Sequence, residues 1–384
     1  HQILAPDDPM LARTWNGDKS RFIIQGRVID PTTNKSSSQS QADAMMRAVY
    51  AHDRVAFDSV WKWTKANLQV RGDGLLASQW SPGANGKGVV SVNDSMTEGD
   101  EDAALALLFA SKLWSNPSYA QDAQSILNGI WQQETTVNSG VRYIVAGNWA
   151  HVADVDGNAE PVISLSAFAP YAYRIFAEAD PGHAWGELVD SGYALLGQIR
   201  TSSNFGGLIG LAPAVIKLSA NGTLLPAGDT MAGGNAFSVS ASRLPWRLSI
   251  DYLWFKELRA KDAIDGLHFL KDQLQGDSKS LAAGYTTDGT PLSGQESVTL
   301  YAGVVPSLLV TNDPNLDFAN SIFAIKVLAN YNDGPNGPYW GKDPNDYAAQ
   351  TWAWMTTAVM DGAITNLWSG QQLMNWGHAL PQGH

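Results

Sequence analysis

The chain has 384 residues, of which 44% are hydrophobic and 16% are charged, a composition typical of ordered globular proteins. Its 25 basic and 37 acidic residues give a net charge of −12, which disfavours nucleic acid and acidic membranes as partners. The absence of cysteine excludes disulfides, thiolate zinc sites and cysteine nucleophiles, and no apolar run approaches the roughly 18 to 20 residues that span a bilayer.

Apolar residues recur at helical spacing through most of the chain and alternate at period two almost nowhere, which predicts a mostly α-helical protein. Some segments also carry signals for their ends: Asp53 can cap one helix, and Pro117 after Asn116 can begin another. In chain order, helices are predicted at approximately 40–50, 54–69, 100–114, 118–133, 167–178, 185–199, 242–259, 263–275, 317–331 and 347–361.

The predicted helices come in pairs joined by short turns, and no Pro/Ser-rich linker separates them. This pattern favours a single all-α domain over residues 1–384, built from helical hairpins that close into a ring. Longer segments rich in Gly, Ser, Asn and Thr lie at 70–97, 134–165, 201–241 and 276–300. In such a ring we expect these loops to gather at one rim and to carry the function.

The densest acidic segment is Thr97-Glu98-Gly99-Asp100-Glu101-Asp102, directly before an apolar helix. One interpretation is structural: acidic residues suit a first helical turn, and Thr97 with Asp100 resembles a capping box. The other is catalytic, because crowded carboxylates raise the pKa of one group and keep another ionised. The 15 tryptophans favour carbohydrate as a ligand, since indoles stack on sugar rings as readily as they fill cores.

The segment MTEGDEDAALALLFASKLW resembles the signature helix of glycoside hydrolase family 8, the inverting β-glycanases. Further blocks resemble that family in the expected order, and together they cover most of the chain. The resemblance implies an (α/α)6 barrel that acts on a β-linked polysaccharide and uses no cofactor. The blocks lie at 15–30, 38–68, 96–114, 166–170, 240–247 and 345–354.

The departures from the family fall on its catalytic positions. By resemblance, Gln39 stands where the family has its general acid, and a carboxamide cannot donate a catalytic proton. Ser240 stands where the usual base is an aspartate, and a serine cannot activate water by itself. Glu98 matches the aspartate that grips the sugar at the point of cleavage. Asp43 lies four residues after Gln39, on the same face of a helix, and could be a relocated acid or a solvated carboxylate.

The resemblance also indicates residues that bind substrate. Trp80 matches an indole that stacks on a sugar, although it could equally be a packing residue. Arg243 matches an arginine that hydrogen-bonds sugar, and it could also pair with a carboxylate such as Glu98. Asp100 and Tyr347 are further candidates for the cleft. The histidines show no paired metal-ligand spacing, so we expect no metal.

Three functional hypotheses remain open at this stage. The chain could be a glycoside hydrolase acting on β-1,4-glucan, xylan or chitosan, a glycan-binding protein that has lost hydrolysis, or a glycosidase or transglycosidase with relocated acid and base. In each case the partner is a polysaccharide or oligosaccharide. We expect a monomer that is secreted or periplasmic, with a signal peptide already removed. Gln39, Asp43, Glu98 and Ser240 are predicted to surround one cleft.

Overall fold

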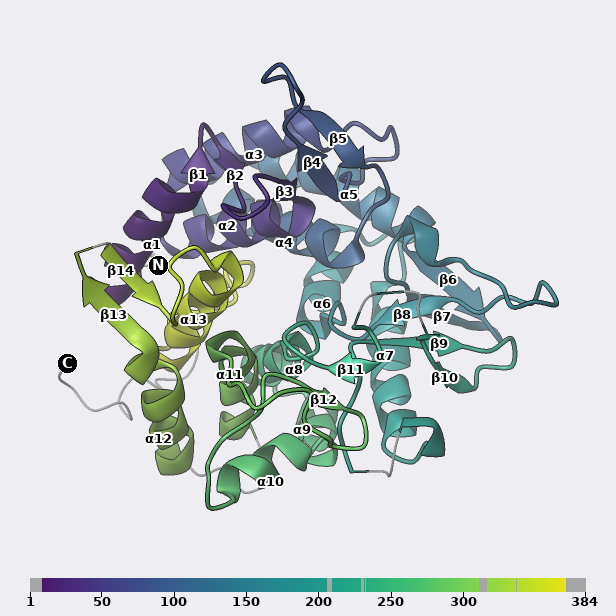
Figure 1. The fold of residues 1–384 in the computed structure, drawn as a ribbon. Helices are drawn as coiled ribbons and strands as arrows, with labels where there is room; N and C mark the ends of the chain where they lie inside the picture. Colours follow the sequence, from purple (N-terminus) through teal and green to yellow (C-terminus); the bar gives the residue numbers. More distant parts are fainter. Residues whose placement is uncertain are drawn as a thin grey trace.

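The structure is a computed structural model, and it is dominated by helices that run around a ring (Figure 1). It describes residues 9–205, 209–228, 231, 233–310, 316–335 and 337–370. The helices are α1 (Pro9–Phe22), α2 (Ser38–Tyr50), α3 (Arg54–Asn67), α4 (Thr97–Leu113), α5 (Pro117–Gln133), α6 (Pro170–Ala179), α7 (Trp185–Ile199), α8 (Arg243–Phe255), α9 (Leu258–Gly266), α10 (Phe269–Gln275), α11 (Val298–Val304), α12 (Leu316–Lys326) and α13 (Tyr347–Met360).

Six of these helices close an inner ring. α2 packs against α4, α4 against α6, α6 against α8, α8 against α11, α11 against α13, and α13 returns to α2. Each inner helix has an outer partner: α3 covers α2, α5 covers α4, α7 covers α6, α9 covers α8 and α1 covers α13, while α12 packs against η4 (Val305–Leu309), which continues α11. The fold is therefore an (α/α)6 barrel, as predicted.

The inner helices are buried on nearly all sides, and the outer helices on one side only. Nearly every residue of α4 from Thr97 to Ala110 is buried, and so is every residue of α13 from Ala349 to Met360. In α4 every residue from Ala103 to Ala110 is apolar, and a helical stretch that is apolar on all sides has to lie inside the protein. The outer helix α3, in contrast, buries one stripe that includes Phe57 and Trp61 and exposes the opposite face.

Short strands occupy the loops between the helices. They are β1 (Ile23–Ile24), β2 (Arg27–Val28), β3 (Ser36–Ser37), β4 (Gln79–Ser81), β5 (Val89–Val92), β6 (Thr135–Asn138), β7 (Val141–Ile144), β8 (Val162–Ser164), β9 (Val215–Leu218), β10 (Leu224–Pro226), β11 (Ala236–Phe237), β12 (Tyr285–Thr286), β13 (Tyr331–Gly334) and β14 (Gly337–Trp340). All of their pairings are antiparallel, among the residues described. With two to four residues each, they are too short to produce a period-two pattern.

The long loops contact one another in order around the ring. The side chain of Asn148 accepts a hydrogen bond from the backbone N–H of Ser95 at 2.7 Å, which joins the loops 70–97 and 134–165. Strands β8 and β9 join the second loop to 201–241, and β11 and β12 join that loop to 276–300. These contacts support the prediction that the loops gather at one rim.

Three helix boundaries were predicted wrongly. α8 ends at Phe255, because Lys256 adopts a left-handed conformation (φ 55°) and its N–H bonds back to Tyr252. The predicted helix 263–275 is the end of α9 followed by the separate helix α10. α12 ends at Lys326, five residues early, and the helices α1 and α11 were not predicted.

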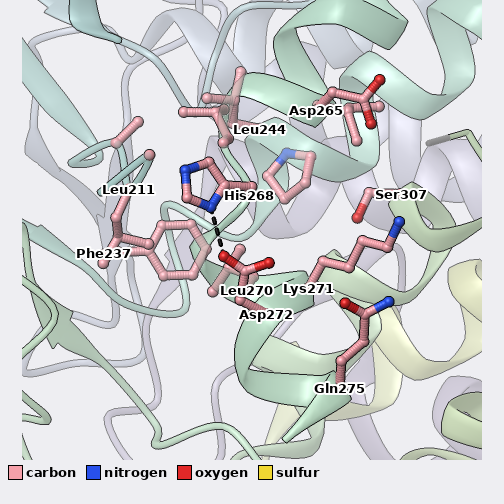
Figure 2. A pocket seen from close by; sticks show the side chains of 15 residues that line it. Leu211, Phe237, Leu244, Asp265, His268, Leu270, Lys271, Asp272, Gln275 and Ser307 are labelled. Atoms are coloured by element: carbon pink, nitrogen blue, oxygen red, sulfur yellow. Dashed lines mark hydrogen bonds and ion pairs between the residues drawn. The ribbon is translucent and has the colours of Figure 1, made fainter. Parts of the chain in front are cut away.

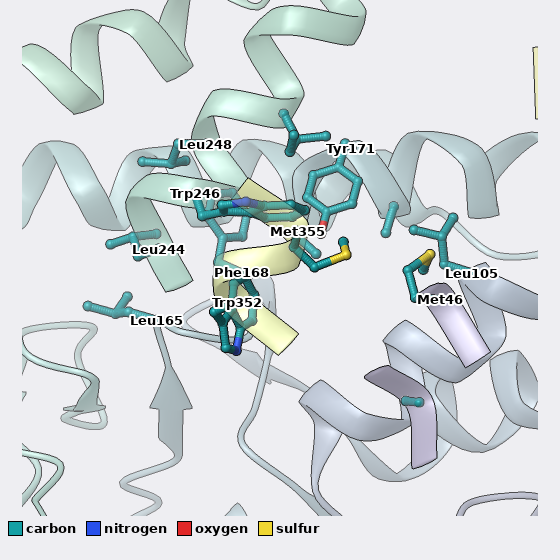
Figure 3. Close-up of a cluster of buried hydrophobic side chains, with 14 of the residues drawn as sticks. Met46, Leu105, Leu165, Phe168, Tyr171, Leu244, Trp246, Leu248, Trp352 and Met355 are labelled. Carbon is teal, nitrogen blue, oxygen red and sulfur yellow. The ribbon is translucent and has the colours of Figure 1, made fainter. Parts of the chain in front are cut away.

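The core is one continuous cluster of buried apolar side chains that runs from Leu11 to Leu367. Figure 3 shows its centre, where Trp246 from α8 meets Trp352 and Met355 from α13. The two indole rings make an edge contact with their centroids 5.3 Å apart. In the described part of the chain, no helix is long and apolar enough to cross a membrane.

Candidate active site

Three inner helices present pairs of polar side chains within their first two turns. A spacing of four residues places both members of a pair on the same face of a helix. The N-terminus of a helix carries a partial positive charge, which favours carboxylates at that end. The pairs are Gln39 and Asp43 on α2, Glu98 and Asp102 on α4, and Arg243 and Arg247 on α8.

Arg247 holds the cluster together. Its side chain is 1% exposed, and its two terminal nitrogens lie 2.9 Å from the two carboxylate oxygens of Asp102. One of these nitrogens also lies 3.1 Å from Glu98 Oε1, and Nε donates to the carbonyl of Ser166 at 2.8 Å. Such bidentate pairing fixes the geometry of a carboxylate as well as its charge. Arg247 therefore joins α8 to α4 and to the segment that precedes α6.

Arg243 is the second cation of the cluster. Its Nη1 lies 2.7 Å from Glu98 Oε1, so the ion pair anticipated from the sequence is confirmed. The guanidinium also lies over the ring of Trp352, 5.1 Å from its centroid. The carbonyl of Ser240 accepts a hydrogen bond from the N–H of Arg243 at 3.2 Å, and the side chain of Ser240 is exposed. Ser240 thus lies one turn before the arginine that holds Glu98.

Gln39 and Asp43 complete the cluster. Gln39 Nε2 donates to Asp43 Oδ1 at 2.8 Å and to Asp102 Oδ2 at 3.0 Å. Removal from water is the main cause that raises the pKa of Asp43, to about 7. The nearby charges of Asp102 and Glu98 also raise it, whereas the charge of Arg243 and the hydrogen bond from Gln39 lower it. Asp43 therefore keeps its proton to a higher pH than an ordinary aspartate does.

Asp43 borders a small pocket that extends into the barrel. The pocket has about 30 Å³ of free space, about the volume that one molecule occupies in liquid water. Its walls are mostly aromatic and apolar, and Asp43, Asp102, Arg247 and Thr351 add polar groups; the other lining residues are Met46, Tyr50, Leu105, Tyr171, Trp246, Trp254, Trp352 and Met355. A carboxyl in such surroundings is poorly solvated, which is the cause of its raised pKa.

Asp100 lies away from these groups. It is fully buried, and its Oδ1 accepts a hydrogen bond from the N–H of Leu76 at 2.9 Å. Burial and the neighbouring carboxyl of Glu134 raise the pKa of Asp100 well above its usual range. This placement favours a structural role for Asp100 over contact with substrate. The capping box was predicted wrongly, because Thr97 donates to the carbonyl of Val145 and the cap of α4 is Met96.

Two other candidates lie on different elements. Trp80 is on β4, half-buried, with Trp63 against it at 5.4 Å and the guanidinium of Arg27 at 4.4 Å from its ring. Tyr347 begins α13 and donates a hydrogen bond to the carbonyl of Ser40 at 2.9 Å, so it holds the first turn of α2. The structure thus brings Gln39, Asp43, Glu98 and Arg243 into one cluster, with Ser240 and Tyr347 joined to it through backbone contacts.

Sequence reasoning missed four members of the cluster: Asp102, Arg247, Tyr171 and Trp352. The first two could have been found by the four-residue spacing, because an acidic pair on one helix and a basic pair on another are complementary. Tyr171, which accepts a hydrogen bond from Arg247 at 2.8 Å, gives no such signal. Within the described residues, no group of three or more His, Asp or Glu side chains is arranged to hold a metal ion.

The fold and the cluster define a class of protein, an (α/α)6 barrel with several carboxyl groups at the N-terminal ends of its inner helices. The family model described as "Glycosyl hydrolases family 8" matches residues 3–323. The chain therefore belongs to glycoside hydrolase family 8.

Relatives with known names agree with this. The chain is 27% identical over 334 residues to "Endoglucanase A" of Acetivibrio thermocellus, covering 82% of this chain and 63% of that protein. It is 31% identical over 217 residues to "Endoglucanase" of Cellulomonas uda, covering 56% of this chain and 57% of that protein. The chain thus matches less than two thirds of the length of these relatives.

Solved structures share the fold at lower identity. The apo structure of a "Beta-1,3-1,4-glucanase" from Paenibacillus sp. X4 superposes with a TM-score of 0.75 at 24% identity, covering 91% of this chain and 90% of that one. "Structure of a cold-adapted family 8 xylanase" gives a TM-score of 0.71 at 16% identity, covering 96% and 93%. These matches agree with the barrel architecture.

Proposed function

We propose that this chain binds a β-linked polysaccharide of the β-glucan or xylan class and hydrolyses it with Asp43 as the proton donor. What supports this is the position of Asp43, which borders the apolar pocket and accepts a hydrogen bond from Gln39 at 2.8 Å, in surroundings that raise its pKa to about 7. By resemblance, Gln39 occupies the position of the family's acid. The proton donor has therefore moved by one helical turn along the same face of α2.

The charged groups around Asp43 suit this role. Hydrolysis of a glycosidic bond passes through a transition state with positive charge on the sugar ring. Glu98 and Asp102 supply negative charge there, and Arg243 and Arg247 hold both carboxylates in place. A carboxyl with a pKa near 7 can donate a proton to the leaving oxygen at neutral pH.

The base is the weak part of the site. An inverting glycosidase needs a second carboxylate, roughly 6.5–9.5 Å from the acid, to activate a water on the other side of the ring. Ser240 stands at that position by resemblance, and its hydroxyl can hold a water but cannot take its proton. We therefore propose slow hydrolysis, and a secreted or periplasmic location where polysaccharide is accessible.

The second candidate is a glycan-binding protein without hydrolysis. It is favoured by the two substitutions at Gln39 and Ser240, which remove both family groups while the ion pairs of Glu98 remain. The two candidates agree on the ligand and differ only in turnover.

One experiment separates them. Reducing-sugar release and equilibrium binding are measured on the same panel of β-glucan, xylan and chitosan, with the parent chain and the Asp43→Asn variant. Turnover that disappears in the variant while binding remains supports the proposal. Binding without turnover in the parent supports the second candidate, and failure to bind any member of the panel would contradict both.

A further inference from the structure

A second pocket lies among α8, α9, α10 and the segment before β9. It has about 160 Å³ of free space and shares no lining residue with the pocket beside Asp43. Figure 2 shows its side chains, with Leu211 and Phe237 on one side and the residues of α9 and α10 on the other. None of its lining residues belongs to the catalytic cluster.

The size of this pocket limits what it can hold. An apolar cavity of about 150 Å³ accommodates one benzene molecule, so a pocket of about 160 Å³ accommodates a single six-membered ring. Its inner wall is apolar and buried; it is formed by Leu211, Phe237, Leu244, Pro245, Ile264 and Leu270. This wall offers a surface for the flat face of a ring.

Polar side chains also line the pocket. His268, the N-cap of α10, and Lys271, Asp272 and Gln275 recur at spacings of three and four residues, so they lie on one side of this helix. His268 Nδ1 lies 2.6 Å from Asp272 Oδ2, and both side chains are more than half exposed. Asp265 from α9 adds a second carboxylate. The rim therefore carries both signs of charge, together with an amide.

A pocket with these walls suits one kind of ligand. Charges of both signs favour a neutral ligand, because an anion would face two carboxylates and a cation would face Lys271. The apolar wall requires a ring with an apolar face, and the polar rim requires hydrogen-bonding groups at its edge. A pyranose unit has both features.

We infer that this pocket binds one neutral pyranose unit of a β-linked glycan, away from the catalytic cluster, and so holds the polymer on the barrel. The choice of β-linked glycan rests on the proposed function, whereas the size and chemistry of the pocket do not. The role is that of an anchoring site, because no member of the catalytic cluster lines it.

The test uses methyl NMR on the whole chain. Leucine and isoleucine methyl groups are labelled, and cellobiose or xylobiose is added up to about 50 mM, a range that covers the millimolar dissociation constants of small ligands. We expect saturable shifts at Leu211, Leu244, Ile264 and Leu270. The same shifts should occur in the Trp80→Ala variant, because Trp80 does not line this pocket.

Two variants test whether polar side chains at the rim of the pocket contribute to disaccharide binding. Asp272→Ala and Gln275→Ala should each weaken the binding about 3- to 10-fold, the effect of losing one or two hydrogen bonds. The control is Gln273→Ala, on the same helix, because Gln273 is exposed and does not line the pocket. It should leave the affinity unchanged.

The outcomes distinguish this inference from the proposed function. Absence of shifts at the pocket methyl groups with both disaccharides overturns the inference, whether or not the chain hydrolyses glycan. Shifts that survive both rim variants unchanged overturn it as well. Shifts at the pocket without turnover on any β-glycan support the anchoring site and contradict the hydrolase proposal.

Discussion

The replacement of Asp43 by asparagine tests the proton donor directly. An amide keeps the shape of the side chain and still accepts the hydrogen bond from Gln39, but it cannot donate a catalytic proton to the leaving oxygen. General acid catalysis typically contributes 10²–10⁴-fold to the rate, so hydrolysis should fall by that factor. Glycan affinity should change by less than about threefold, because the ion pairs of Glu98 remain.

The same replacement should change stability in a pH-dependent way. The pKa of Asp43 is about 7, against an ordinary value of 3.8, so the folded chain keeps a proton that the unfolded chain releases. Between about pH 4 and pH 7 the unfolded state therefore binds fewer protons, and stability falls as the pH rises. A shift of about three pKa units corresponds to at most about 4 kcal/mol, and solvent screening of the partly exposed side chain reduces this to about 2 kcal/mol.

An asparagine side chain is neutral at every pH, so Asp43→Asn should be more stable than the parent by about 2 kcal/mol at pH 7.5 and equal to it at pH 4. Urea unfolding at the two pH values measures this. Asp277→Asn is the control, because Asp277 is exposed and lies outside both pockets. Unchanged hydrolysis in Asp43→Asn, or equal stability differences at both pH values, would refute the reasoning.

Three further predictions concern the cluster and Trp80. Arg247→Met should destabilise the fold by about 3–5 kcal/mol in urea unfolding, because it leaves the carboxylate of Asp102 without its buried cationic partner; a loss below about 1 kcal/mol would contradict this. Trp80→Ala should weaken oligosaccharide binding by roughly 1–3 kcal/mol in calorimetry, with little effect of moderate salt, if its ring stacks on a sugar. Ser240→Asp alone should raise hydrolysis, measured as reducing-sugar release, because Asp43 already supplies the acid and the site lacks only the base; unchanged hydrolysis would count against Asp43 as the proton donor.

Much of the architecture could be predicted from the sequence. The long inner helices α4 and α13 contain runs of consecutive apolar residues, such as 103–110 and 352–355, and helices of this kind have strong signals. The break after Phe255 could not be predicted, because a lysine in a left-handed conformation leaves no mark in the pattern of apolar residues. The short strands were missed for a similar reason: they are specified by neighbouring loops rather than by their own two to four residues.

The candidate site was predictable in part. The resemblance placed Gln39, Glu98 and Arg243, and the four-residue spacing added Asp43. Asp100 lies in the same acidic segment as Glu98 but on another face of α4, where it contacts Leu76 and Glu134. Sequence proximity does not tell which carboxylate of a helix turn faces the cleft, since that depends on what packs against each face.

The most direct measurement of the central claim is a structure of the chain with an uncut β-linked oligosaccharide across the barrel. The account predicts that a carboxyl oxygen of Asp43 lies about 2.6–3.2 Å from a glycosidic oxygen, the distance a proton donor requires. A glycosidic oxygen that instead contacts the amide of Gln39, with Asp43 out of hydrogen-bonding reach, would contradict it.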